Sequence, residues 1–531
     1  MQRAEQSLDI LADWGTEHLQ RVIAIDSQSD EQSASIPSTP GQRVLSDDLA
    51  AFFRALDYEV SQDSFANLLV TIPPNVSHEV PSVAFMVHMD TAQGTQAVSE
   101  MEQVPAWSGA LIAYPGNEHL QVSAELYPET RVFLGDDVLH GPGLAPIGLD
   151  DKLGMCELMT LARVLRANPH IPHGELLLVF RPDEEIGRMA AVEGLAETFV
   201  QRGVRYAYTV DGIAPFEINV ENFNASCARV RIPATALQGT AEASTRRLTI
   251  RINGVKSHGA TAKAEGYLNA TLIFARAMQE LAARSDVHPV GFQSDAEAET
   301  NADWTVLCSG DLDAAEAAIM EALRAQCEPH AWRGARAWVT AREEGSSQGD
   351  SEGLRHVAQH LQAFLTQPGV QPRLSEESEG REGYSNPYFL SLDEGAWRVD
   401  YRLRDFDKAG LAAREEHVRA VAQASGIAPS TVEIVAQYDN MGPTLAPYPE
   451  LVDWALSALE PLGVAARQYP IRGGTGVDPF VERSIPVANL GTGYFAPESE
   501  KELTSRQNIA RHSAWLINLV QVIAGAPSSE R

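Results

Sequence analysis

The 531-residue sequence predicts an α/β fold, in which a mixed-sheet α/β domain made from both ends of the chain carries a smaller, inserted α+β domain. Two patterns support this prediction. Short, continuous apolar runs alternate with amphipathic helical segments up to about residue 211, and alternating strand patterns then replace them until about residue 408. The length also exceeds that of one ordinary domain, so two cores are expected.

The α/β domain is expected to begin with helices at 7–26 and 43–56, where apolar side chains recur at helical spacing. Further helices and buried strands are then expected, with strands at 58–61, 67–72, 83–87, 176–180 and 206–210 and helices at 153–167 and 190–200. Sheets of this class bind ligands beyond the carboxyl ends of their strands. Candidate site residues should therefore follow the strands.

The inserted domain is predicted over 222–407, between the parts 1–221 and 408–531 of the α/β domain. Its strands are expected at 225–233, 247–253 and 396–403, and a helix at 262–284. Within it, residues 290–375 have the order strand, helix, strand, helix, at 303–308, 312–326, 335–342 and 352–366. The sequence shows no short-period repeat.

The strongly acidic composition argues against proteins that bind nucleic acids or anionic membrane surfaces. Lysine and arginine number 41 and aspartate and glutamate 72, which gives a formal charge of -31. Nucleic acids and anionic membrane surfaces need a basic face, so neither is an expected partner. Much of this acidity serves solubility.

The chain has no targeting or membrane signal that we recognise. Its first residues lack an apolar signal core, and no run of about 18 apolar residues occurs. The four cysteines are far apart and form no Cys-x-x-Cys pair, so the sequence indicates neither a thiolate zinc site nor a disulfide framework. We therefore expect a soluble, cytoplasmic protein.

The segment Arg181–Gly187 follows the apolar run 176–180 and carries two adjacent carboxylates, Glu184 and Glu185. Successive residues point in different directions, so one carboxylate can bind a metal while its neighbour faces what the metal activates. A Glu-Glu pair alone is more commonly a solvated acidic loop. The other polar residues that follow strands favour the metal site.

Six acidic or imidazole side chains fall just after predicted strands, namely His88, Asp90, Asp150, Glu184, Glu185 and Asp211. Imidazole and carboxylates are ligands for zinc and similar divalent ions. In His88-x-Asp90, the carboxylate can accept the second ring N–H and fix the tautomer. Two alternatives stay open: His88 as a core histidine, and Asp150, beside Asp151, as a helix N-cap.

The segments that carry these residues resemble the M20 family of two-zinc peptidases in order and spacing, at Val87–Thr91, Gly148–Gly154, Arg181–Gly187 and Tyr208–Gly212. Four further segments are similar to its tripeptide aminopeptidases, at Pro37–Gln42, Glu221–Ala225, Arg404–Asp407 and Pro470–Thr475. The resemblance covers nearly the whole chain outside two insertions, at 234–247 and about 290–375.

The resemblance implies two divalent metal ions, expected to be zinc, in a catalytic domain with a lid or dimerisation domain. His88 and Asp211 would hold one ion, Glu185 the other, and Asp150 would bridge them. Asp90 would orient His88. Glu184 would be the general base for a metal-activated water.

The resemblance also implies four substrate-binding residues. His258, in Ser257–Lys263, would help to stabilise the oxyanion, although Gly259 replaces a family proline. Arg404, Asn440 and Arg472 would hold the backbone and terminal carboxylate of the substrate, a role that suits the guanidinium fork.

The sequence departs from the family at the second metal. A late histidine is expected there, but Glu498 takes its position and Lys501 replaces a second histidine. Glu498 would ligate the metal and shift its preference toward manganese or cobalt, or pair with Lys501 so that the site is lost. Gly476–Asp478 also differ from the family residues near Arg472.

The resemblance implies an enzyme that removes the N-terminal residue from short peptides, expected to be tripeptides. The alternatives are a related M20 dipeptidase or N-acyl amino acid hydrolase, and a peptide-binding homologue with impaired catalysis. A homodimer through the lid domain is the implied assembly. The 290–375 insertion would either lengthen the dimerisation sheet or imitate a partner subunit.

Overall fold

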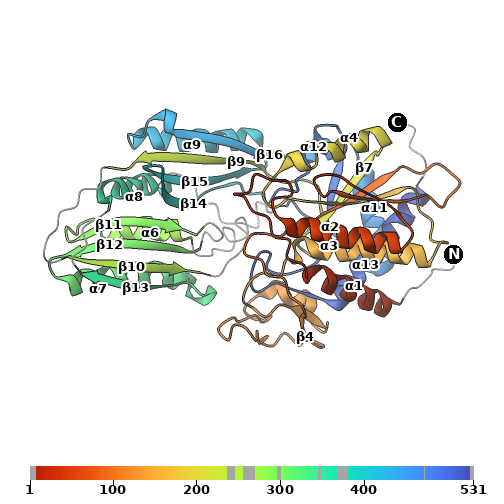
Figure 1. Cartoon of the computed structure of the whole chain (residues 1–531), viewed down its shortest axis with the longest axis horizontal. Helices are drawn as coiled ribbons and strands as arrows, with labels where there is room; N and C mark the ends of the chain where they lie inside the picture. Colours follow the sequence, from red (N-terminus) through yellow and green to blue (C-terminus); the bar gives the residue numbers. More distant parts are fainter. Residues whose placement is uncertain are drawn as a thin grey trace. The chain divides into compact units, whose positions relative to one another are not determined.

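The computed structural model describes residues 7–235, 245–254, 269–295, 300–344, 349–366, 381–471 and 473–526. The chain forms two compact units (Figure 1): unit 1, Met1–Asn222 with Asn440–Arg531, and unit 2, Phe223–Asp439. The predicted boundary at 407 is wrong, because α9 (Lys408–Ala424) and β16 (Val432–Tyr438) belong to unit 2. β16 pairs there with β9 (Asn224–Pro233), more than 200 residues earlier in the chain.

Unit 1 is built on an eight-stranded mixed sheet with the order β1-β2-β6-β3-β7-β18-β8-β17. Its strands are β1 (Glu59–Gln62), β2 (Leu68–Ile72), β3 (Val83–His88), β6 (Leu176–Arg181), β7 (Tyr206–Gly212), β8 (Glu217–Asn219), β17 (Arg467–Gln468) and β18 (Val487–Gly491). The central strands β6, β3, β7 and β18 are parallel and almost entirely buried. Burial on both faces explains why they appear in the sequence as continuous apolar runs.

The main helices of unit 1 are α1 (Leu8–Ile23), α2 (Pro40–Ala55), α3 (Leu149–Ala167), α4 (Glu193–Arg202), α11 (Glu450–Leu459) and α13 (Arg506–Gly525), with short turns α10 (Gly442–Leu445) and α12 (Asp478–Val481). α1, α3 and α13 pack together (Figure 1). Gly15 permits this approach, because a Cβ there would lie 2.2 Å from Cγ2 of Ile509. Among the described residues, no helix is long and apolar enough to cross a membrane.

A small three-stranded sheet completes unit 1 and consists of β4 (Glu102–Val104), β5 (Val138–His140) and β19 (Leu503–Ser505). β19 comes from the C-terminal part of the chain and pairs with β5 from the N-terminal part. Both ends of the chain therefore contribute to unit 1.

Unit 2 contains two four-stranded antiparallel sheets, ordered β14-β15-β9-β16 and β11-β12-β10-β13. The remaining strands are β10 (Thr245–Asn253), β11 (Val287–Ser294), β12 (Ala302–Ser309), β13 (Arg336–Glu344), β14 (Tyr384–Asp393) and β15 (Ala396–Asp405). Its other helices are α6 (Ala270–Glu280), α7 (Leu312–Cys327) and α8 (Ser351–Leu365). Of the predicted helix 262–284, residues before 269 lie outside the described part.

Sequence analysis missed β11 and β14. Pro289 and Gly291 interrupt the apolar pattern of β11, where the register with β12 also shifts, and Pro387 lies at a similar shift in β14. Proline cannot donate to a strand ladder, which makes such strands hard to predict. Both strands lie at sheet edges, where proline is tolerated.

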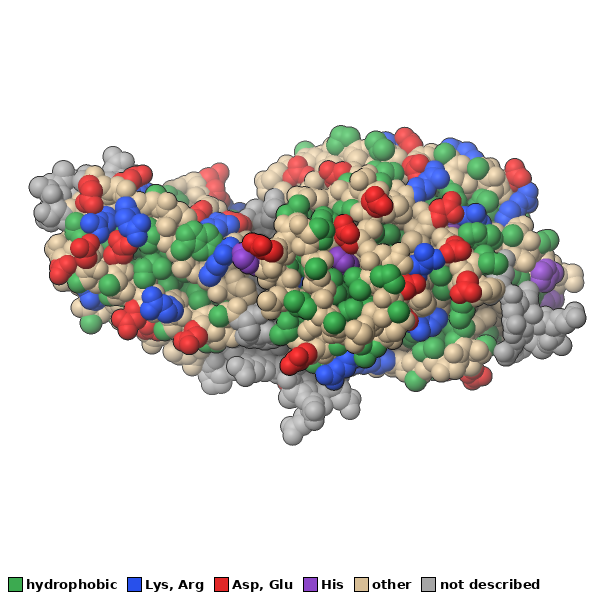
Figure 2. Space-filling model, turned by 90° about the horizontal axis from the view of Figure 1, so that it is seen from below, with side chains coloured by type: hydrophobic (Ala, Val, Ile, Leu, Met, Phe, Trp, Pro, Cys, Tyr) green, Lys and Arg blue, Asp and Glu red, His purple; other side chains and the backbone are tan. Residues whose placement is uncertain are grey.

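The acidic side chains do not gather into one patch on the face in Figure 2, where red acidic groups are interspersed with blue basic ones. All four cysteines are free thiols, and three of them are buried. The acidity on this face is therefore consistent with a solubilising role.

Candidate metal centre

The parallel strands β6, β3 and β7 end at the same edge of the unit 1 sheet. His88 is the last residue of β3 and lies opposite Arg181 at the end of β6. Glu184 and Glu185 follow β6 in the next turn, and Asp211 lies at the end of β7. The sheet thus brings together side chains more than 120 residues apart in the sequence.

His88 lies at the centre of the cluster and is 1% exposed. Its Nε2 lies 3.0 Å from Oδ1 of Asp150 and 3.3 Å from Oδ1 of Asp211. Its Nδ1 lies 2.9 Å from the backbone oxygen of Asp90 and 3.4 Å from Oδ1 of that residue. Burial alone would lower the pKa of His88, but Asp211, Asp150 and Asp90 raise it well above its usual value.

Asp90 links His88 to the acidic turn. Its Oδ1 accepts a hydrogen bond from the backbone N–H of Glu184 at 2.9 Å, and its Oδ2 accepts one from the N–H of Glu185 at 3.0 Å. The side chain of Asp90 is fully buried. One carboxylate therefore fixes the backbone of both glutamates, while the nearer partner of the histidine ring is the Asp90 carbonyl.

Asp150 and Asp151 lie in the first turn of α3 and depart from helical φ and ψ values, and the peptide bond between them is cis. Gly148 precedes this turn with a φ of 81°, and no side-chain hydrogen bond caps the helix there. The Asp150 carboxylate lies against His88 and accepts a hydrogen bond from the Tyr494 hydroxyl at 2.8 Å. Asp151 accepts the backbone N–H of His88 at 3.1 Å.

The described residues contain two overlapping sets of candidate metal ligands. Within each set the ligand atoms lie within 4.8 Å of one another, and the sets are His88, Asp150 and Glu185, and His88, Asp151 and Asp211. The structure thus gathers four of the predicted ligands. It also adds Asp151, which sequence analysis missed, although the Asp-Asp pair before a buried helix was a visible signal. The groups of both sets together offer the nitrogen and oxygen ligands that divalent ions bind.

The electrostatics of this cluster favour a bound cation. Burial raises the pKa of Asp211 to about 6 and that of Glu184 to about 7, against the lowering effect of His88. Burial, followed by the charges of Glu498 and Asp150, raises the pKa of Glu185 well above its usual value. Oε1 of Glu185 is also buried without a hydrogen-bond partner. Crowded, desolvated carboxylates of this kind need a positive charge, so the residues present fit divalent metal ions.

Glu498 does not belong to either of these sets of described residues. It is half-buried, has a φ of 52°, and acts electrostatically on Glu185. Lys501 is buried, and its ammonium donates a hydrogen bond to Oγ of Ser499 at 2.9 Å. This bond ties the lysine to a neighbouring residue of the same segment.

Arg181 is a further residue that sequence analysis did not single out. It is 2% exposed, lies 3.6 Å from Oε1 of Glu184, and donates to the backbone oxygens of Thr475 and Gly476 at 2.7 and 2.6 Å. A Cβ at Gly476, where φ is +54°, would lie 2.3 Å from the guanidinium. The positive φ favours glycine at this position, which departs from the family pattern.

Two of the four predicted substrate residues, Asn440 and Arg404, lie in the described part of the chain. The side-chain oxygen of Asn440, in unit 1, accepts the N–H of Asn222 at 3.3 Å and of Gly442 at 2.8 Å. Arg404, in unit 2, donates to the backbone oxygens of Ser226 and Leu403 and lies over the Tyr438 ring. His258 and Arg472 lie outside the described residues.

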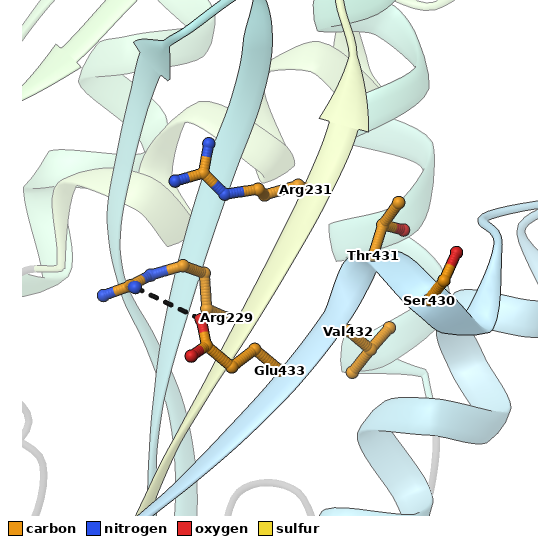
Figure 3. A pocket seen from close by; sticks show the side chains of 6 residues that line it. All are labelled: Arg229, Arg231, Ser430, Thr431, Val432 and Glu433. Carbon is orange, nitrogen blue, oxygen red and sulfur yellow. Dashed lines mark hydrogen bonds and ion pairs between the residues drawn. The ribbon is translucent and has the colours of Figure 1, made fainter.

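A separate hollow of about 420 Å³ lies on unit 2 between β9 and β16 (Figure 3), lined by Arg229, Arg231, Ser430, Thr431, Val432 and Glu433. Arg229 pairs with Asp400 and Glu433, and Arg231 with Asp393. Because carboxylates already neutralise these guanidinium groups, we assign the hollow no anion-binding role.

No protein-family model matches the chain. Among curated proteins, peptidase T of Brevibacillus brevis is 26% identical over 522 residues, which cover 96% of this chain and 98% of that protein. Peptidase T of a Geobacillus species is 25% identical over 515 residues, with coverage of 95% and 97%.

Solved structures show the same fold. Aminoacylhistidine dipeptidase from Vibrio alginolyticus matches with a TM-score of 0.55 and 16% identity, covering 98% of this chain and 99% of its own. A tripeptidase from Staphylococcus aureus matches with a TM-score of 0.51 and 14% identity, with coverage of 97% and 98%. Over nearly its whole length, the chain is therefore similar in sequence to peptidase T, and it has the same fold as these two peptidases.

Proposed function

We propose that the chain is a metallo-aminopeptidase that removes the N-terminal residue from short peptides, with tripeptides as the main substrates. One observation carries this proposal: two overlapping sets of candidate metal ligands share His88, beside the half-buried Glu184, in a chain that is similar to peptidase T over nearly its whole length. The arrangement follows the strand ends of the sheet, where α/β enzymes bind their ligands.

The proposed metal ions are two zinc ions, with manganese or cobalt as alternatives. His88 and Asp211 would hold one, Glu185 and Glu498 the other, and Asp150 would bridge them. Bound there, divalent ions supply Lewis acidity toward a carbonyl oxygen and lower the pKa of water.

Glu184 is the proposed general base. Its pKa of about 7, raised by burial, suits a group that accepts and returns a proton near neutral pH. Asp90 holds its backbone, and Arg181 lies 3.6 Å from its carboxylate. These contacts restrict where Glu184 can move.

The peptide would be held by His258, Arg404, Asn440 and Arg472, as the family resemblance implies. A free α-amine separates the proposed activity from that of an N-acyl amino acid hydrolase, and substrate length separates it from that of a dipeptidase. A binding protein without turnover is a weaker alternative, because Asp90 and Glu184 are both present and Asp90 holds the backbone of Glu184.

The proposed compartment is the cytoplasm, which agrees with four free cysteines. The family resemblance allows a homodimer through unit 2, or a single chain whose insertion takes the place of a partner. Contacts inside unit 2 support the second arrangement.

The test is hydrolysis after loading with zinc or manganese, using a tripeptide, its N-acetylated form and a dipeptide. We expect the free tripeptide to be cleaved fastest. Glu184→Gln should lower kcat by about 10²- to 10⁴-fold with unchanged metal content. The matched control is Glu217→Gln, at a buried glutamate of the same unit, and this variant should keep its activity.

Equal cleavage of the N-acetylated tripeptide would contradict the aminopeptidase assignment. Faster cleavage of the dipeptide would favour the dipeptidase. A metal-loaded chain that binds tripeptide but cleaves nothing would show a binding protein.

A further inference from the structure

The two sheets of unit 2 have the same topology. In each, the chain order is strand, helix, strand, strand, helix, strand: β9, α8, β14, β15, α9 and β16 in one, and β10, α6, β11, β12, α7 and β13 in the other. The spatial orders β14-β15-β9-β16 and β11-β12-β10-β13 put corresponding strands at the same positions, all antiparallel. We call them the first repeat and the inserted repeat.

Corresponding positions also carry similar residues. β9 has Val-Arg-Ile at 230–232 and β10 has Ile-Arg-Ile at 250–252, and the apolar members of both triplets are fully buried. The first helix of each repeat begins with a side-chain cap: Asn269 accepts the N–H of Leu272, and Asp350 that of Gly353. The similarity thus extends from topology to local structure.

One ion pair occurs in both repeats at the same register. Arg231 of β9 pairs with Asp393 at the end of β14 at 3.1 Å (Figure 3 shows this arginine on β9), and Arg251 of β10 pairs with Asp295, just after β11. Arg231 lies in the same cross-strand row as Ser391, and Asp393 comes two residues after Ser391. Arg251 likewise lies in the same row as Gln293, and Asp295 comes two residues after Gln293. A shared row and a shared ion pair indicate a duplicated structure.

The two repeats contact each other through equivalent elements. β11 lies beside β14, and α6 lies beside α8 (Figure 1). The first helix of each repeat also contacts the edge strand of the other repeat. Arg355 of α8 donates to the backbone oxygen of Val287 in β11, and Asn269, at the start of α6, donates to the backbone oxygen of Pro387 in β14 at 3.0 Å. In a two-fold homodimer, the helix of each copy contacts the strand of the other in this reciprocal way.

The repeats also share one hydrophobic core. Buried side chains of α8, such as Leu354 and Leu361, belong to the same cluster as Ile273 and Phe274 of α6. Without the inserted repeat, part of this apolar surface would face water, at a cost of about 25 cal/mol per Å². The first repeat therefore needs a partner on this face.

We propose that the inserted repeat is a built-in partner: it occupies the face of the first repeat that a second copy of the chain would otherwise cover, so the protein is a monomer. The ends of the insertion support a self-contained module. The N–H of Thr235 donates to Oδ2 of Asp350 at 3.1 Å, so the points where the chain leaves and re-enters the first repeat are in contact.

The experiment measures mass by sedimentation equilibrium for the full chain and for a variant in which a short glycine-serine linker replaces residues 236–349. The full chain should have the mass of one chain up to tens of micromolar. The shortened chain should be a dimer, because its β14 and α8 face is exposed. Circular dichroism and zinc binding by unit 1 report whether the shortened chain is folded.

A matched pair of substitutions in the shortened chain locates the contact. Gln362 of α8 donates to the backbone oxygen of Ala275 in α6, so Gln362→Glu would bring two carboxylates near the new two-fold axis and weaken the dimer about tenfold or more. Gln423→Glu, on the exposed side of α9, should leave it unchanged. A full chain that dimerises, or a folded shortened chain that stays monomeric, would overturn the proposal. If the shortened chain does not fold, the mass of the full chain alone decides.

Discussion

Asp90→Asn should separate the support of the metal centre from the metal ligands themselves. The Asp90 carboxylate accepts the backbone N–H groups of Glu184 and Glu185 with one oxygen each. An asparagine has a single side-chain acceptor oxygen, so in either orientation its NH₂ group faces one of these buried N–H donors. The substitution keeps the volume and removes one hydrogen bond together with the charge.

The expected loss of stability follows from the two hydrogen bonds that Asp90 accepts. A hydrogen bond to a charged group contributes about 1.5–3 kcal/mol, and a buried donor without a partner costs a similar amount. We expect Asp90→Asn to lower the free energy of unfolding by about 3 kcal/mol. Because the turn that carries Glu185 shifts, zinc affinity and peptide hydrolysis should fall about 10- to 100-fold, as for other residues that support metal ligands.

The assay combines zinc titration by calorimetry, tripeptide hydrolysis and thermal unfolding. The matched control is Asp350→Asn in unit 2, which is similarly buried and accepts hydrogen bonds from Gly353 and Trp397. It should lose stability while zinc affinity stays unchanged. Wild-type zinc affinity and turnover in Asp90→Asn would refute the assigned support of Glu184 and Glu185.

Three further predictions concern other residues. Glu498→His should raise zinc affinity over that for manganese, measured by competitive titration, because imidazole is the softer ligand; an unchanged preference would mean that residue 498 is not a ligand. Glu502, whose Oε2 accepts the N–H groups of residues 147–149, should tolerate Gln but lose about 3 kcal/mol or more as Ala, seen as a lower Tm, since three buried donors lose their partner. Burial lowers the pKa of His360 from 6.5 to about 4, so its neutral form stabilises the fold above pH 6.5, and about 3 kcal/mol should be lost as the pH falls to 4. His360→Gln should flatten the Tm profile in that window, and an unchanged profile would contradict this origin.

The sequence predicted the centre of unit 1 well, because its parallel strands are buried on both faces. The runs at 83–87 and 176–180 are continuous and apolar, and the polar residues that follow them mark the sheet edge. What periodicity could not provide was the role of Asp151, since adjacent aspartates before a helix are also typical of an N-cap. The contact of the Asp151 carboxylate with the His88 N–H depends on the non-helical φ and ψ values of Asp150 and Asp151.

The organisation of unit 2 was harder to predict for a different reason. The first repeat is interrupted after β9 by the whole inserted repeat, so its parts never form a contiguous period in the sequence. The similarity of the triplets 230–232 and 250–252 is too short to reveal the repeat. The end of the unit was misplaced for the same reason, because β16 pairs with the distant β9.

The two-part construction of unit 1 has a consequence for synthesis on the ribosome. β18 lies between β7 and β8, and Arg181 is held by the carbonyls of Thr475 and Gly476, so the sheet and the turn with Glu184 are incomplete until about residue 490 has emerged. Unit 2 is one continuous stretch and can fold earlier, since domains generally fold as units during translation. We expect nascent chains stalled before β18 to contain a protease-resistant unit 2 and no peptidase activity.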